Sequence, residues 1–295
     1  MRVAAVDLGT NTTRLLVADV DGRRVDEVHR ETHITRLGEG VDSRRRLLPV
    51  PIARVRNVLT DYRRTIESLG AERALAVATS AVRDAENGEA FLGEVEWSYG
   101  FSTRLLSGDE EAELTRRGVD PTPRTLVLDI GGGSTELILD EFHVSLPMGS
   151  VRFTERYGDD LEACAAAARA LLQEHAQVEP RAAIGVAGTV MTLAALDLGS
   201  GRVDGYRLSA VSARAELERL AAMTLDERRR VPLLDPERAP VIVAGAVILV
   251  ETLAFFSLDA IEVSVRDLLD GAALAAAELP SAEEGAAPPG AYTCC

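Results

Sequence analysis

The sequence lacks lysine altogether, so all 32 basic residues are arginine. This absence excludes a Walker A nucleotide site, a pyridoxal Schiff base and a lysine nucleophile, because each needs a lysine amine. Arginine keeps its charge and binds phosphate with two donors at once, so a polyanionic ligand stays open. The 47 acidic residues bring the net charge to −15. Nonspecific nucleic-acid binding needs a broad basic face, so nucleic acid is not expected as a partner.

Cysteine and long apolar runs are also scarce. The three cysteines are Cys164, Cys294 and Cys295, and no pair of them has zinc-ligand spacing. Without a disulfide framework, we expect a reducing, cytoplasmic compartment. The longest apolar run, 239–250, ends at Glu251. It is too short to span a bilayer, so a buried helix is expected there and no membrane partner.

A repeated motif organises the chain, whose 295 residues suit two domains. Asp7-x-Gly9-x-x-Thr12 matches Asp129-x-Gly131-x-x-Ser134, and each copy follows an apolar strand and precedes another strand and a hairpin. Duplication predicts two similar α/β domains, 1–120 and 121–279, with mixed sheets flanked by helices. The two Asp-Gly turns are then expected to meet in the interdomain cleft. A homodimer is left open.

The remaining boundaries follow from periodicity and composition. Residues 120–123 have the Pro-rich composition of a linker, and residues 280–295 have no apolar period and are expected to be disordered. The last helix is expected either to belong to the second domain or to pack back on the first. Helices are expected at 50–69, 159–177, 210–222, 236–256 and 267–278.

The chemistry of an Asp-x-Gly turn suits phosphate. Its carboxylate lies at the edge of the sheet, beside backbone N–H groups that glycine can turn toward an anion by adopting a positive φ. The carboxylates of Asp7 and Asp129 would repel phosphate directly, which implies an intervening Mg²⁺ or Mn²⁺. Glu136, on a largely apolar strand, needs a cationic partner, either a metal ion or an arginine. Arg14 occupies the equivalent point of the first copy.

Three further segments carry candidate groups. Ser107–Ala112 opens an acidic helix, where Asp109 and Glu110 are expected to cap the helix and Glu111 either does the same or points inward. Arg83 begins a helix after a strand and either reaches a phosphate or lies on a solvated face. Gly188-Thr189 follows a buried strand and is a weaker candidate for a phosphate-binding turn. The arginine clusters 44–46 and 228–230 are expected to be solvated.

Five motifs occur in order along the chain: Val6–Thr12, Ala78–Arg83, Ser107–Ala112, Leu128–Glu136 and Ala187–Thr189. Together they resemble the exopolyphosphatase and guanosine pentaphosphate phosphohydrolase family, within the actin-like ATPase superfamily. The resemblance spans roughly residues 3–279 and implies duplicated actin-like (ribonuclease H-like) domains. The element Ser264–Gly271 is also similar to the family, but departs from many relatives at Arg266 and Asp270. The chain ends before the added C-terminal helical domain of longer members.

The resemblance implies Mg²⁺-dependent hydrolysis of a terminal phosphoanhydride of inorganic polyphosphate or guanosine pentaphosphate. By this resemblance Glu111 is the base that activates water, and the metal-proximal carboxylates are Asp7, Asp129 and Glu136. The phosphate-binding residues it implies, with those proposed above from the turns, are Gly9, Thr10, Asn11, Arg14, Arg83, Gly131, Gly132, Gly133, Ser134, Gly188 and Thr189.

Two other functions fit the motifs. An actin-like sugar or acetate kinase also carries two Asp-Gly turns, but a water-activating Glu111 favours hydrolysis. A non-catalytic sensor of guanosine alarmones is the second alternative, and an intact Glu111 argues against it. The residues do not separate polyphosphate from guanosine pentaphosphate.

Overall fold

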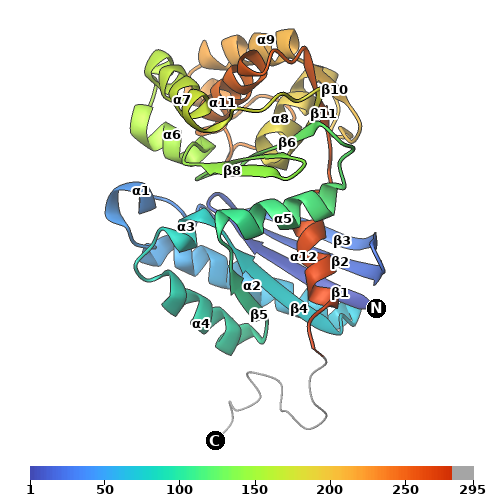
Figure 1. The fold of residues 1–295 in the computed structure, drawn as a ribbon. Coiled ribbons are helices and arrows are strands. Elements are labelled where there is room, and N and C mark those ends of the chain that lie inside the picture. The colour runs from blue at the N-terminus through green and yellow to red at the C-terminus, as the bar shows by residue number, and fades with distance from the viewer. Residues whose placement is uncertain (281–295) are drawn as a thin grey trace, which may run out of the picture. The chain divides into compact units, whose positions relative to one another are not determined.

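The computed structural model describes residues 1–280 and divides into two compact units. Of the described residues, unit 1 contains 1–118 and 268–280, and unit 2 contains 119–267. Figure 1 shows both units as a sheet covered by helices. The expected tail, 280–295, and the terminal cysteines lie, apart from Pro280, outside the described residues.

Unit 1 is built on a five-stranded mixed sheet in the order β3-β2-β1-β4-β5. β1 pairs antiparallel with β2 and parallel with β4. The strands are β1 (Arg2–Leu8), β2 (Thr12–Asp21), β3 (Arg24–Ile34), β4 (Arg73–Ala78) and β5 (Ser102–Leu105). The helices are α1 (Val41–Arg44), α2 (Pro49–Leu69), α3 (Ser80–Arg83), α4 (Gly88–Tyr99), α5 (Gly108–Val119) and α12 (Leu268–Ala277).

Both faces of this sheet are covered by apolar side chains. β1 is buried on both faces, as expected of a central strand whose residues are almost all apolar. One face packs on α2 and α4. The buried residues of these helices, including Tyr62 and Phe91, form a core with the strands. The other face packs on α12, the last described helix, through Leu269 and Leu274. Figure 1 shows this C-terminal helix against β1 and β2.

Unit 2 has a six-stranded mixed sheet in the order β10-β11-β9-β6-β7-β8. Its strands are β6 (Thr125–Ile130), β7 (Thr135–Leu139), β8 (Phe142–Leu146), β9 (Ala182–Val186), β10 (Arg207–Ser209) and β11 (Ala260–Val263). Its helices are α6 (Ser150–Tyr157), α7 (Leu161–His175), α8 (Ala187–Leu198), α9 (Ala210–Ala221), α10 (Leu225–Arg228) and α11 (Ile242–Phe255). α11 is apolar on nearly all sides and is buried against α6, α7, α8 and α9.

The two sheets repeat the same arrangement. In each, an antiparallel three-stranded meander (β1-β2-β3 and β6-β7-β8) is extended by a parallel strand beside its first strand (β4 and β9). The predicted fold class, duplicated α/β units with mixed sheets flanked by helices, is confirmed.

Two local predictions differ from the structure. The helix expected at 236–256 begins only at Ile242, because Pro240 lacks an amide hydrogen and residues 235–241 form turns instead. The segments that form α6 and α8 were not predicted as helices. Among residues 1–280, no helix is long and apolar enough to cross a membrane.

Candidate functional site

The first Asp-Gly turn joins β1 to β2 and leaves its amides available. The amide of Gly9 donates to the carbonyl of Thr12 at 2.9 Å and closes the turn. The carbonyls of Thr10 and Asn11 accept hydrogen bonds from the segment 35–38. Within residues 1–280, no backbone carbonyl accepts from the amides of Thr10 and Asn11. Neighbouring amides left in this way form a concave site for an anion.

The second turn, between β6 and β7, has the same construction. The amide of Gly131 donates to the carbonyl of Ser134 at 3.0 Å. The carbonyls of Gly131 and Gly132 accept from residues 150–152 at the start of α6. In the described part of the chain, the amides of Gly132 and Gly133 make no backbone hydrogen bond. The repeat therefore preserves hydrogen-bond geometry as well as sequence.

The glycines of these turns are needed for space. Neither Gly9 nor Gly131 has a positive φ, so the expectation that φ demands glycine there is wrong. A Cβ on Gly9 would lie 3.0 Å from the carbonyl oxygen of Thr12, and one on Gly131 would lie 3.1 Å from that of Ser134. Both contacts are tight against backbone that cannot move without breaking the turn.

Asn11 carries the plainest sign of a ligand. Its side chain is 6% exposed, and neither its oxygen nor its nitrogen has a hydrogen-bond partner among residues 1–280. Buried amides are nearly always paired, since an unpaired one costs about 1–3 kcal/mol. An anion bound at this turn would accept from the Asn11 amide nitrogen.

The carboxylate of the first turn is neutralised within unit 1. Asp7 lies opposite Arg14 on the paired strands β1 and β2. The Nη2 and Nε atoms of Arg14 lie 2.8 and 2.9 Å from Asp7 Oδ2, and both side chains are largely buried. Tyr62 supports the same strand, because its hydroxyl donates to the carbonyl of Thr13 at 2.8 Å. Burial raises the pKa of Tyr62, so its proton is retained.

The second turn has a carboxylate where the first has arginine. Asp129 lies directly opposite Glu136 on β6 and β7, and both are buried, at 6% and 1% exposure. Ser145 on β8 donates to Glu136 Oε1 at 2.8 Å, which fixes the orientation of that carboxylate. Ser145 was missed by sequence reasoning, because only the register of β7 and β8 brings it beside Glu136.

Glu111 and Arg83 contact one another. Glu111 lies in the first turn of α5 and is 6% exposed, so it points inward. Arg83 Nη1 lies 3.2 Å from Glu111 Oε2 and also donates to the carbonyl of Leu106 at 2.7 Å. Glu110 is a helix cap: its carboxylate accepts from the amide of Ser107, whose hydroxyl accepts from the amide of Glu110.

The third turn of interest begins α8. Ala187 has a φ of 63°, a left-handed conformation that is uncommon outside glycine. Gly188 is partly exposed, and a Cβ there would overlap the guanidinium of Arg238, which sequence reasoning missed. Thr189 is buried, with its side chain close to Gly245 on α11, so its hydroxyl faces the core.

The arrangement suits a divalent cation held together with phosphate. Residues 1–280 contain no group of three or more histidine, cysteine, aspartate or glutamate residues placed to hold a metal. Mg²⁺ does not need one, because it commonly binds one or two carboxylates and completes its shell with phosphate and water. Asp129 and Glu136 offer such a pair of oxygen donors.

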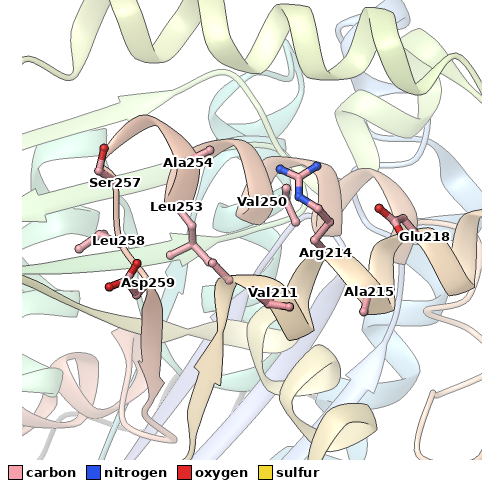
Figure 2. A pocket seen from close by; sticks show the side chains of 11 residues that line it. Val211, Arg214, Ala215, Glu218, Val250, Leu253, Ala254, Ser257, Leu258 and Asp259 are labelled. Carbon is pink, nitrogen blue, oxygen red and sulfur yellow. The ribbon is translucent and has the colours of Figure 1, made fainter.

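A surface pocket of unit 2 lies elsewhere. It measures about 460 Å³ and lies between α9 and the end of α11. Figure 2 shows Val211, Leu253 and Ala254 in its lining, with Arg214 and Glu218 alongside. None of the candidate residues lines it. The candidate site is therefore built from turns that present amides, not from this pocket.

Comparisons with known proteins agree on one family. Residues 16–277 match the model of the Ppx/GppA phosphatase family. Exopolyphosphatase 2 of Mycobacterium tuberculosis H37Rv is 39% identical over 318 aligned positions, covering 94% of this chain and 98% of that protein.

Solved structures extend the agreement to the fold. The crystal structure of an exopolyphosphatase-like protein superposes with a TM-score of 0.86 at 33% identity, covering 93% of this chain and 98% of that one. The Aquifex aeolicus member of the Ppx/GppA family has a TM-score of 0.78 at 28% identity, with 94% and 97% coverage.

Proposed function

This chain belongs to the Ppx/GppA phosphatase family, and on that premise we propose that it releases terminal phosphate from inorganic polyphosphate, preferring short chains. The similarity to an exopolyphosphatase of M. tuberculosis supports the substrate class. The observation that carries the proposal is the pair of matching turns with available amides, of which the first also holds the unpartnered side chain of Asn11. Such turns bind phosphate oxygens through backbone N–H groups.

Mg²⁺ or Mn²⁺ is the proposed cofactor. Asp129 and Glu136 would hold it, with Asp7 as a weaker third carboxylate because Arg14 already contacts its Oδ2. When bound, the cation would neutralise phosphate charge and polarise the phosphorus–oxygen bonds. The oxygen donors of these side chains match the preference of Mg²⁺.

Glu111 is the proposed general base. Its carboxylate would take a proton from a water molecule as the water oxygen attacks the terminal phosphorus. The bond from that phosphorus to the bridging oxygen breaks, and the electron pair stays with the shortened chain. Such transfer depends mainly on positioning and charge neutralisation, so turns, cation and base are chemically sufficient.

Arg83 would change partners during this reaction. Without substrate it forms an ion pair with Glu111 at 3.2 Å. A terminal phosphate carries more negative charge than one carboxylate and would compete for the same guanidinium. Movement of Arg83 onto phosphate would leave the Glu111 carboxylate able to accept the proton from water.

The remaining phosphate contacts would come from main chain and arginine. Gly9, Thr10 and Asn11 supply the first turn, and residues 131–134 supply the second. Arg14 adds positive charge beside the first turn. At α8, Gly188 would contribute its exposed backbone beside the guanidinium of Arg238, whereas Thr189 would contribute backbone only.

Phosphate release from polyphosphate and from guanosine pentaphosphate, measured side by side without an acceptor, tests the function. The proposal expects release from polyphosphate. Release from the guanosine substrate alone would show that the protein is a guanosine pentaphosphate phosphohydrolase instead. Binding of the alarmone without release would indicate the sensor, and transfer only in the presence of an acceptor would indicate a kinase.

The preference for short chains follows from charge. The protein carries a net charge of −15, so phosphates far from the turns meet repulsion that high salt weakens. Digestion of long polyphosphate should therefore give an early ladder of intermediates through distributive release. Processive disappearance of long chains without intermediates would contradict this preference.

A further inference from the structure

Three consecutive arginines on unit 1 have no counter-charge. Arg44, Arg45 and Arg46 end α1 and begin the loop toward α2, and all three are exposed. Within residues 1–280, none of them forms an ion pair. By contrast, Arg14, Arg30 and other arginines of the same unit pair with carboxylates. In a protein of net charge −15, an adjacent set of unpaired cations is unusual.

The loop that carries these arginines is held in place by backbone contacts. The carbonyl of Arg45 accepts from the amide of Glu86 at 2.8 Å. Leu47 and Asn87 exchange two hydrogen bonds, of 2.8 and 3.1 Å. Glu86 supplies the amide of this contact, and in the described residues its side chain forms no ion pair with the arginines. The backbone that carries the three arginines is therefore a platform held in place by hydrogen bonds.

That platform continues into the first phosphate turn. The amide of Gly38 donates to the carbonyl of Thr10 at 2.8 Å, and Gly38 leaves no room for a Cβ beside the Thr10 methyl. One segment, 35–47, thus covers the turn at one end and carries the arginines at the other. On the second side, Glu86 follows Arg83 by three residues. The cluster is anchored to both segments that hold candidate phosphate contacts in unit 1.

We propose that Arg44, Arg45 and Arg46 form a distal phosphate site, which holds the part of a polyphosphate chain beyond the first turn. This inference rests on the proposed function. Adjacent unpaired guanidinium groups repel one another, and a polyanion relieves that repulsion at several points at once. A linear chain of phosphates can contact several consecutive cations, and these three lie on the segment that also covers the turn. The site would extend binding by a few phosphates, in keeping with a short-chain enzyme.

The test compares two triple variants of equal charge. R44Q/R45Q/R46Q removes the cluster, and R181Q/R202Q/R207Q removes three exposed arginines of unit 2 that lack ion pairs within the described chain. Both variants carry a net charge of −18, which is −15 − 3. The measurement is kcat/KM for tripolyphosphate and for long polyphosphate at several salt concentrations.

The cluster variant should lose roughly tenfold in kcat/KM for long chains at low salt, and its log–log salt slope should fall by about 2–3, near one per phosphate contact. Its kcat/KM for tripolyphosphate should stay near wild type, and the control variant should keep the wild-type slope. Equal slopes in the two variants would overturn the distal site while wild-type phosphate release stands. No release by wild type would instead overturn the proposed function, and the distal site with it.

Discussion

The two Asp-Gly turns share a backbone and differ in charge. Gly9 and Gly131 close their turns with nearly equal hydrogen bonds, of 2.9 and 3.0 Å. The residue opposite the aspartate is Arg14 in the first turn and Glu136 in the second. Duplication thus kept the anion-binding geometry, while one cross-strand position came to carry opposite charges in the two copies.

This difference separates the requirements of the two turns. In unit 1 the Arg14 guanidinium lies 2.8 Å from Asp7 Oδ2 and offsets the charge of that carboxylate. In unit 2 the residue opposite the aspartate is a second buried acid, Glu136. We propose that the second turn, with two acidic side chains, needs an external cation to bind phosphate, and that the first turn needs none.

Removal of divalent cations gives the largest expected effect. Excess EDTA should abolish phosphate release, because the second turn would then oppose its own ligand, and added Mg²⁺ should restore it. The measurement is initial phosphate release with and without chelator. Full turnover in excess EDTA would show that neither turn requires a cation, because arginine alone would then neutralise the substrate.

Glu111→Gln gives the next largest effect and tests a group outside both turns. Loss of a general base costs roughly 10²–10⁴-fold in turnover, with substrate affinity unchanged or improved. Glu110→Gln is the matched control. Glu110 is the neighbour of Glu111 and takes part in the helix cap with Ser107, so this substitution should cost the protein only about 1 kcal/mol of stability. Turnover of Glu111→Gln within threefold of wild type would sink its assignment as base.

Arg14→Gln and Glu136→Gln should affect stability differently. Arg14→Gln strands the buried Asp7 carboxylate, and breaking such a pair costs about 3–5 kcal/mol. Glu136→Gln keeps an oxygen that can accept the hydrogen bond from Ser145, so without metal it should change stability by less, about 1 kcal/mol. Urea unfolding in EDTA measures both. Equal losses would show that Glu136 is neutralised inside the protein as fully as Asp7.

Ser145→Ala should have the smallest effect. It removes the 2.8 Å hydrogen bond that orients Glu136 Oε1. Loss of such an outer contact typically weakens metal binding about tenfold, with little change in saturated turnover. Ser212→Ala, which removes the side chain of another serine of unit 2, is a control remote from the turn. A Mg²⁺ titration of activity that leaves Ser145→Ala at the wild-type midpoint would show that the bond has no role.

The sequence predicted the turns well and their surroundings poorly. Asp7, Gly9, Asp129 and Gly131 stand at apolar strand ends, where spacing alone predicts their position. The repeat correctly placed Arg14 at the position equivalent to Glu136, but the pairing of Arg14 with Asp7 was not predicted. The interpretation of Glu110 as a cap follows from its spacing from Ser107.

The missed residues depend on contacts between distant segments. Ser145 contacts Glu136 only because of the register of β7 and β8. Arg238, which precedes α11, lies beside Gly188 at the start of α8, far away in the sequence. No local pattern marks either. The helix expected from residue 236 begins at Ile242, because the spacing of apolar residues does not show which of the preceding residues form turns. The space requirement at Gly9 depends on a carbonyl that local propensity does not place.

Metal titration of two aspartate variants tests the comparison most directly. Asp129→Asn and Asp7→Asn make the same chemical change at equivalent points of the two turns. Asp129→Asn should raise the half-saturating Mg²⁺ concentration by at least about tenfold, and Asp7→Asn should raise it much less, because Arg14 already takes part of that carboxylate's charge. Direct Mn²⁺ binding should give the same order. Equal shifts in the two variants, or a larger shift for Asp7→Asn, would contradict the claim that only the second turn depends on a cation.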